Sequence, residues 1–466
     1  MKNPSQEAFI TLLNRTKSQG KIAIAAGCVP QSEPTLKDLE NCSVVGITNI
    51  GRIAEVLEEA IKGNTVQLLE REELPKLALP KIRRNKWIEI LPLSTGCLGQ
   101  CTFCKTRQAR GTLISYEPEE IVNRAKQVVE EGVTELWMTS EDVGTYGRDI
   151  GKSFPELCWQ VLSVLKPHNI LKLGMTNPPY ILEHMKEMAV LLNHPQIYSH
   201  LHIPVQTGSN KVLEGMVREY VIEDFNKLCD YLLENVPDIT LATDIICGFP
   251  GETEEDFEMT LNLVKKYHFD SVYISQFYPR PGTVAAAMKK IDTKIVKKRS
   301  TELTKLFESY TTYDKMLNTE QKVWITSIEV NKKNIENEKQ EAMIGHTKNY
   351  VKVLIRQVDY NLIGKCVKVK ITETSKWHII GKVIATDNVI EEILPVAHYK
   401  KEFQKTEVNY RAKERFDKLK EELKQKDKVN QSEDKPDIEK KNYTRIILLI
   451  GAVLIVLGAF LIYMKT

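Results

Sequence analysis

Three cysteines lie within eight residues of one another, in the segment Thr95-Gly-Cys97-Leu-Gly-Gln-Cys101-Thr-Phe-Cys104. Their spacing also fits one face of a helix. However, the glycines and β-branched threonines of the segment disfavour a helix, whereas a glycine-rich loop lets three thiolates converge on one iron–sulfur cluster. We therefore predict that Cys97, Cys101 and Cys104 bind a 4Fe-4S cluster and leave one of its irons without a protein ligand.

The open iron suggests which chemistry the cluster supports. It can take the amino and carboxylate groups of S-adenosylmethionine, and an electron passed to the sulfonium then gives a 5′-deoxyadenosyl radical, which protein side chains alone cannot supply. The chain has nine cysteines, and three so close together favour metal binding over a disulfide framework. Lys and Arg number 65 against 62 Asp and Glu, so the net charge of +3 identifies no partner class by itself.

A strand-then-helix rhythm surrounds the cysteines and indicates how they are positioned. Six predicted strands alternate with helices, and the cysteine loop follows the first strand. This rhythm is typical of a partial (β/α) barrel, whose chemistry takes place at the carboxyl ends of the strands. We assign residues 87–315 to this α/β barrel. The predicted strands are residues 87–93, 135–139, 171–174, 200–205, 240–246 and 271–276.

The residues before the barrel predict a smaller α/β domain and a linker. Residues 1–70 alternate helix and strand, as in a parallel α/β domain, but show only two or three strands. Residues 71–86 contain two prolines and the basic run Lys81-Ile-Arg-Arg84, so they are interpreted as a linker that could contact phosphates.

Residues 316–386 predict a small antiparallel β-barrel with a basic surface. Residues 322–382 contain 12 Lys or Arg against 6 Asp or Glu. Aromatic rings interleaved with basic charge favour a nucleic-acid binding domain, although an ordinary soluble β domain can have the same composition. The aromatic residues are Trp324, Tyr350, Tyr360 and Trp377.

The last residues predict a charged spacer and an apolar helix. Residues 387–443 are rich in charges of both signs and are expected to form a solvated linker. Residues 446–464 carry no charge and as a helix would span about 28 Å, close to the thickness of a bilayer core. We therefore predict a single transmembrane helix over residues 444–464 that anchors the chain by its tail, with a buried core helix as the alternative.

Several motifs resemble those of one radical S-adenosylmethionine family. Over nearly all of residues 1–384 the chain is similar to the methylthiotransferases that modify threonylcarbamoyladenosine in tRNA, and its tail resembles that of their eukaryotic, membrane-tailed branch. Besides the cysteine loop, the matching motifs are Ala26-Gly-Cys28-Val-Pro-Gln, Lys105-Thr-Arg-Gln-Ala-Arg-Gly, Thr139-Ser-Glu-Asp-Val-Gly-Thr-Tyr-Gly-Arg-Asp, Gly174-Met-Thr-Asn-Pro-Pro-Tyr, His202-Ile-Pro-Val-Gln, Thr243-Asp-Ile-Ile-Cys-Gly-Phe-Pro-Gly-Glu-Thr and Gln276-Phe-Tyr-Pro-Arg-Pro-Gly-Thr.

The resemblance implies an activity, its cofactors and a location. The expected substrate is N6-threonylcarbamoyladenosine at position 37 of tRNA, and the expected product is its 2-methylthio derivative. Two molecules of S-adenosylmethionine are expected per turnover, one as methyl donor and one as radical source, together with an external electron donor. The small β-barrel resembles the TRAM domain of the family, which binds RNA. The tail implies the endoplasmic reticulum membrane, with the catalytic part facing the cytosol.

The resemblance also implies residues that contact S-adenosylmethionine. Glu141 and Asp142, just past the second barrel strand, lie where such enzymes hold the amino group of the cofactor, and a carboxylate suits an ammonium. Gln206 and Arg218 could reach its polar groups or its carboxylate, for which an arginine has bidentate geometry. Solvated loop acids are the alternative for the first two residues, and surface roles are the alternative for the others.

A second cluster of the family implies one more ligand, Cys28. Family members hold this auxiliary 4Fe-4S cluster, the expected source of the inserted sulfur, on three cysteines of the N-terminal domain. Only the third has a counterpart here, so we expect residues 1–70 to be a truncated domain whose ligand set is incomplete. Cys42 is the other nearby thiol, but the family motif places no ligand there. The four remaining cysteines are expected to be buried free thiols: Cys158, Cys229, Cys247 and Cys366.

Two hypotheses of function follow. The first is a radical tRNA methylthiotransferase. The second is a truncated, membrane-tethered tRNA-binding form with one cluster, which cannot insert sulfur and regulates the full-length enzyme. A radical enzyme acting on a substrate other than RNA is disfavoured by the basic C-terminal barrel.

Overall fold

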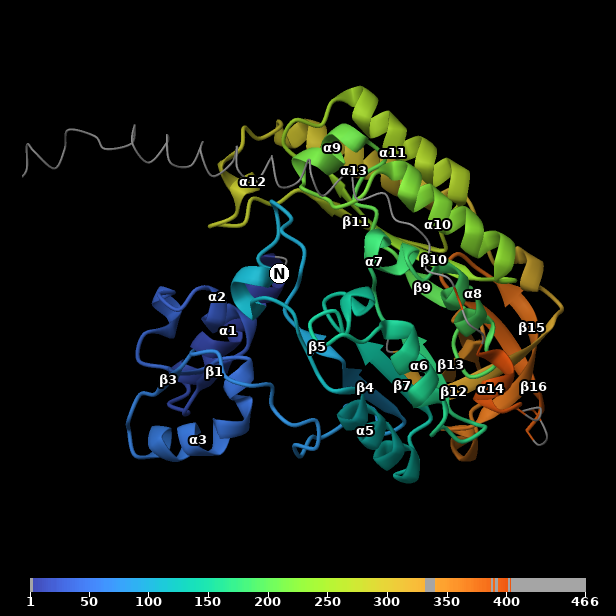
Figure 1. Ribbon diagram of the computed structural model, residues 1–466, viewed down its shortest axis with the longest axis horizontal. Helices are drawn as coiled ribbons and strands as arrows, with labels where there is room; N and C mark the ends of the chain where they lie inside the picture. Colours follow the sequence, from blue (N-terminus) through green and yellow to red (C-terminus); the bar gives the residue numbers. More distant parts are fainter. Residues whose placement is uncertain (1–2, 332–339, 387–388, 390–392, 401–402, 404–466) are drawn as a thin grey trace, which may run out of the picture. The chain divides into compact units, whose positions relative to one another are not determined.

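The computed structural model describes residues 3–331, 340–386, 389, 393–400 and 403. Within these residues a small α/β domain, a larger α/β domain and a five-stranded barrel follow one another along the chain (Figure 1).

The first domain is a small parallel α/β unit. Its elements are α1 (Asn3–Ser18), β1 (Ile24–Ala26), α2 (Cys28–Ser32), η1 (Lys37–Leu39), β2 (Ser43–Val45), η2 (Thr48–Arg52), α3 (Ile53–Ile61) and β3 (Gln67–Leu68). The sheet has the order β1-β2-β3 with both pairs parallel. Leu13 of α1 packs with Leu39 and Val44 in a small buried core. The three strands agree with the few strands that the sequence indicates.

The second domain is built on six parallel strands in two adjoining sheets. The strands are β4 (Ile88–Pro92), β7 (Glu135–Thr139), β8 (Ile170–Leu173), β9 (His200–His202), β10 (Thr240–Cys247) and β11 (Ser271–Gln276). The sheets have the orders β4-β7-β8 and β11-β10-β9, and a parallel bridge between Leu171 and Ile197 connects them. All six strands begin within one residue of the predicted starts.

The helices of this domain follow from capping residues and apolar spacing, as α11 (Glu254–Tyr267) illustrates. Thr253 and Asp256 form a capping box, in which the hydroxyl accepts from one amide at 3.3 Å and the carboxylate from the other at 2.9 Å. Phe257 and Val264 then bury one face of the helix against the core. The other elements are β5 (Ser94–Thr95), α4 (Thr106–Arg110), β6 (Ile114–Ser115), α5 (Pro118–Glu130), η3 (Val143–Thr145), α6 (Phe154–Leu162), α7 (Pro178–Leu182), α8 (Met185–Asn193), α9 (Asn210–Gly215), α10 (Ile222–Asn235), α12 (Val284–Ala287) and α13 (Thr293–Glu308).

The third domain is a closed barrel of five strands. Its elements are η4 (Asp314–Met316), β12 (Glu320–Asn331), β13 (Gln340–Thr347), β14 (Lys352–Ile355), η5 (Tyr360–Leu362), β15 (Cys366–Thr374) and β16 (Ile379–Ala385), and α14 (Val396–Tyr399) follows it. The order around the barrel is β12-β13-β14-β16-β15, and β14 and β16 run parallel. The expectation of a wholly antiparallel barrel is therefore wrong, because the directions of five strands cannot alternate all the way around a closed ring.

This barrel packs against the starts of the strands of the second domain. The indole N–H of Trp324 donates to the carbonyl of His168 at 3.1 Å, just before β8. The Thr134 hydroxyl donates to the carbonyl of Gly364 at 2.7 Å, just before β7. The Ser199 amide, just before β9, also donates to a carbonyl of the barrel. Because the strands are parallel, the contacts lie at their amino ends, opposite the ends where the chemistry is expected.

The four aromatic residues of this barrel divide into two pairs. Trp324 is 4% exposed and Tyr350 packs on Tyr198 with ring centroids 4.8 Å apart, so these two rings contribute to the domain contact. Tyr360 and Trp377 are 64% and 61% exposed. Only the second pair lies on the surface, where an RNA base can stack.

Ion pairs attach the linker between the first two domains to the second domain. Lys81 and Arg83 both form ion pairs with Glu89, which is completely buried in β4, and Arg83 also contacts Glu131. Acids of the protein therefore neutralise these two cations, and a phosphate contact of the basic run stays a prediction.

One buried histidine makes the domain contact sensitive to acid. The His346 ring stacks on Tyr350 at 4.3 Å, and its Nδ1 is buried without a hydrogen-bond partner among the described residues. Burial, aided by Lys172 and Lys352, lowers the pKa of His346 to about 4. The unfolded chain, with a histidine pKa near 6.5, therefore binds a proton more readily, and stability present above pH 6.5 is lost as the pH falls towards 4.

We expect the free energy of unfolding to fall between pH 7 and pH 5, with about 2 kcal/mol of the loss due to this one imidazole. Denaturant titrations at the two pH values measure it. His346→Phe, which keeps the stacking on Tyr350, should show a smaller fall. An equal fall in the variant would assign the effect to other groups.

The predicted fold requires a second correction, at its C-terminal end. Among the residues that the structure describes, no helix is long and apolar enough to cross a membrane. The C-terminal transmembrane helix is therefore not supported and is removed from the description of the fold. Residues 444–464 and most of the predicted spacer, 387–443, lie outside the described residues. The expected location at the endoplasmic reticulum stays a prediction.

Candidate active site

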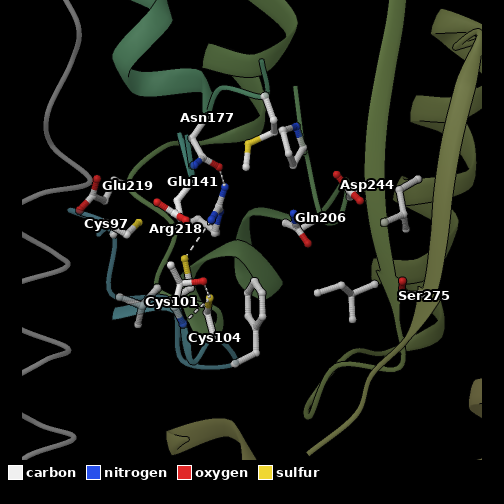
Figure 2. Close-up of a pocket in the computed structure, with 18 of the residues that line it drawn as sticks. Cys97, Cys101, Cys104, Glu141, Asn177, Gln206, Arg218, Glu219, Asp244 and Ser275 are labelled. Atoms are coloured by element: carbon white, nitrogen blue, oxygen red, sulfur yellow. Dashed lines mark hydrogen bonds between the residues drawn. The ribbon is translucent and has the colours of Figure 1, made fainter. Parts of the chain in front are cut away.

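A cavity of about 680 Å³ opens at the carboxyl ends of the parallel strands of the second domain. The cysteine loop forms one wall, and the ends of β9, β10 and β11 form the opposite wall (Figure 2). The polar or sulfur-bearing residues of its lining are Cys97, Cys101, Cys104, Thr106, Glu141, Met175, Asn177, Tyr180, Gln206, Arg218, Glu219, Tyr220, Asp244, Ser275, Gln276, Tyr278 and Arg280. This cavity contains most of the residues that the sequence singles out.

The cysteine loop runs from β5 to α4 and is fixed at both ends. The amide of Cys97 donates to the carbonyl of Gly111 at 3.1 Å, and the amide of Cys104 donates to that of Cys101 at 3.0 Å. Gly96 takes a positive φ of 83°, and a side chain there would lie 1.9 Å from a carbonyl oxygen. The loop therefore needs glycine at this position, as the sequence pattern indicates.

The three thiols fit a cluster by their chemistry and their shared cavity. In the described part of the chain no three Cys, His, Asp or Glu side chains are already arranged around a metal position. However, the Sγ atoms of Cys97 and Cys101 both lie beside Gly99, which has no side chain to separate them. Burial, followed by the neighbouring Cys101 and Asp142, raises the pKa of Cys97 to about 12. Such a thiol stays protonated until a metal ion binds the sulfur and displaces the proton.

The two neighbouring acids have different roles. Glu141 lines the cavity: its Oε1 pairs with Arg110 at 2.7 Å, while its Oε2 is buried without a hydrogen-bond partner among the described residues. Burial raises the pKa of Glu141 and Arg110 opposes that shift. Asp142 does not line the cavity, and accepts hydrogen bonds from the amides of Gly144 and Asn177 at 3.0 and 3.2 Å. Glu141 therefore keeps one carboxylate oxygen without a hydrogen-bond partner among the described residues, whereas Asp142 supports the loop.

Arg218 and Gln206 both face the cavity (Figure 2). Arg218 donates to the Sγ of Cys101 at 2.9 Å and to the side-chain oxygen of Asn177. Gln206 has a positive φ of 70°, and its amide and carbonyl bond to β10 at 2.8 and 2.9 Å. The structure thus brings Arg218 to the cluster loop and holds Gln206 on the opposite wall.

Cys28 lies outside the cavity, at the start of α2, which packs against α4. Lys105, the residue after Cys104, forms an ion pair with Glu33 just past the end of α2. Gln108 donates to a carbonyl of the same helix at 3.4 Å. The first domain is therefore attached to the segment that directly follows the cysteine loop.

Several residues of the cavity were not identified from the sequence. Asn177 and Arg280 belong to two of the motifs that resemble the family, but no separate signal marked their side chains. Asp244 pairs with His202 at 2.6 Å, and Glu219 accepts from the hydroxyl of Tyr180. Asp244 lies within β10 and Glu219 lies between α9 and α10, so neither directly follows a strand, and no sequence signal marked them as cavity residues.

The sequence matches two family models and several named relatives. Residues 91–264 match the Radical SAM superfamily and residues 321–384 match the TRAM domain. The threonylcarbamoyladenosine tRNA methylthiotransferase of Drosophila melanogaster is 48% identical over 392 residues, which cover 82% of this chain and 69% of that protein. The chain belongs to the threonylcarbamoyladenosine tRNA methylthiotransferase family.

Members of this family from distant organisms are also similar in sequence to this chain. The protein of that name from Homo sapiens is 45% identical over 396 residues, covering 84% of this chain and 67% of that protein. A probable threonylcarbamoyladenosine tRNA methylthiotransferase from Pyrococcus horikoshii is 35% identical over 303 residues, which cover 64% of this chain and 71% of that protein. The resemblance inferred from the motifs is confirmed, and the Radical SAM match contains the cysteine loop together with Glu141 and Arg218.

Proposed function

We propose that this chain transfers a methylthio group to C2 of N6-threonylcarbamoyladenosine at position 37 of tRNA. The names of its relatives support the substrate and the reaction, and the TRAM match supports RNA binding. The observation that carries the proposal is the cavity in which three cysteine thiols, Glu141 and Arg218 meet.

The chain's own residues bind and orient the reactants. When bound, a 4Fe-4S cluster with S-adenosylmethionine would supply a 5′-deoxyadenosyl radical, the species able to activate C2 of the adenine. Glu141 is suited to accept hydrogen bonds from the ammonium of S-adenosylmethionine, and Arg218 to donate two to its carboxylate. A base that leaves the anticodon-loop stack can lie against Phe277 and Tyr278, which line the wall facing the cysteines.

The proposal includes a second 4Fe-4S cluster as the sulfur source, with Cys28 as one ligand, and an external electron donor. The attachment of α2 to the segment after Cys104 supports it, because a sulfur source on α2 would then be joined to the radical centre. Cys42 does not suit a ligand, since it is buried in the apolar core and donates to the carbonyl of Ala23 at 3.1 Å.

The second hypothesis, a tRNA-binding form that cannot insert sulfur, is not favoured. The relatives that match 82% or more of this chain carry the name of the enzyme.

Product analysis tests the proposal. Protein reconstituted anaerobically with iron and sulfide is expected to convert tRNA carrying threonylcarbamoyladenosine to the 2-methylthio nucleoside, with one 5′-deoxyadenosine and one S-adenosylhomocysteine per product. Nucleoside mass spectrometry measures all three, and the same tRNA without the threonylcarbamoyl group is the control. 5′-Deoxyadenosine without any methylthio nucleoside would contradict the proposed function.

A further inference from the structure

Arg280, on the loop after β11, is a cation of the cavity that has no anionic partner in the described part of the chain. Its Nη1 donates to the carbonyl of Phe103 at 3.2 Å. Its Nε is buried and has no hydrogen-bond partner, and no carboxylate among the described residues forms an ion pair with it. A guanidinium that is partly removed from water in this way gains most from an incoming anion.

The other charged residues of the cavity are already paired. Arg218, the second guanidinium of the described lining, contacts Cys101 and Asn177. The acids have partners of their own: Glu141 pairs with Arg110, Glu219 with Tyr180 and Asp244 with His202. Arg280 is therefore the guanidinium of the lining that has no side-chain partner among the described residues.

The backbone holds Arg280 ready for such a ligand. Its carbonyl accepts from both the amide and the hydroxyl of Thr283, at 3.1 and 2.7 Å. The amide of Ala285 donates to the carbonyl of Thr102 at 2.9 Å, which ties this loop to the cysteine loop. These bonds fix the backbone at Arg280, and the contact of its Nη1 with the Phe103 carbonyl restricts the side chain, so less side-chain entropy is lost on binding.

We propose that Arg280 binds the carboxylate of the threonylcarbamoyl group and thereby selects the modified adenosine. This inference rests on the proposed function. The threonyl carboxylate is the one anionic group on the substituted base, and the planar guanidinium matches it through paired N–H donors. Phe277 and Tyr278, from the same segment, line the cavity beside it, so the base and its substituent can be recognised together.

The test compares two tRNAs that differ only in charge: one with the threonylcarbamoyl group, and one in which its carboxylate has been converted to the amide. Wild-type protein should favour the carboxylate tRNA by about 10–100-fold in kcat/KM. Arg280→Gln should lower kcat/KM for that tRNA by a similar factor and reduce the preference to less than about threefold. Arg280→Lys should keep part of the preference, and Arg52→Gln, at an exposed ion pair of the first domain, is the matched control.

Other outcomes would overturn the inference. An equal loss for both tRNAs in Arg280→Gln would point to a phosphate contact, and loss of S-adenosylmethionine cleavage without tRNA would point to the cofactor's carboxylate. An unchanged preference would exclude any role in selection. These outcomes differ from failure of the proposed function, in which wild-type protein itself forms no methylthio nucleoside.

Discussion

Replacing Cys97, Cys101 or Cys104 by alanine is expected to reduce the reductive cleavage of S-adenosylmethionine by roughly 10³-fold or more, because every turnover requires the complete set of ligands. The three thiols line one cavity and come from one short loop, so no other described cysteine of that cavity can replace a lost ligand. Iron analysis and the yield of 5′-deoxyadenosine measure the effect. The iron content should fall in parallel with cleavage.

Cys158→Ala is the matched control for these variants. Cys158 is completely buried in α6, among core side chains and away from the cavity. This variant should be less stable because it leaves a small cavity, yet it should retain its iron and its cleavage activity. Full cleavage by any of the three loop variants would show that the cluster is held elsewhere.

The second large effect is expected for stability at Glu89. This completely buried carboxylate in β4 pairs with Lys81 and Arg83 of the linker and with Arg124 of α5, the last at 3.1 Å. Glu89→Gln removes the charge that neutralises three cations, and the loss of one partner from such a buried cluster costs about 3–5 kcal/mol. Denaturant unfolding should show a decrease of this size.

An exposed ion pair provides the comparison for that variant. Glu55→Gln breaks the pair with Arg52 on the surface of the first domain and should leave the unfolding midpoint nearly unchanged. Equal effects of the two substitutions would mean that burial does not determine the energy of the Glu89 cluster.

The sequence predicted the strands and the cysteine loop because both depend on local order. Strand starts follow from the repeating apolar segments. Gly96 and Gly99 favour a loop because glycine disfavours a helix whatever surrounds it. The different roles of Glu141 and Asp142 could not be predicted, since they depend on Arg110 and Asn177, which are distant in sequence. A turn directs two adjacent carboxylates to different environments, and only the assembled fold specifies which one faces the cavity.

In the five-stranded barrel, too, the sequence could not show which residues are buried and which are exposed. Its basic charge and aromatic content were evident from composition, but composition cannot distinguish Trp324, buried against the second domain, from the exposed Trp377. Arg280 was quoted only as part of a motif, because its missing ion-pair partner becomes evident only when the whole cavity lining is known.

The attachment of the five-stranded barrel to the amino ends of the strands sets a length for the substrate. β10 (Thr240–Cys247) runs from that end towards the cavity, and its eight residues span roughly 25 Å. A single nucleoside cannot reach from the cavity to the barrel. An RNA that contacts both must extend over that length, so a substrate that uses the barrel is much larger than the one base at which the chemistry takes place.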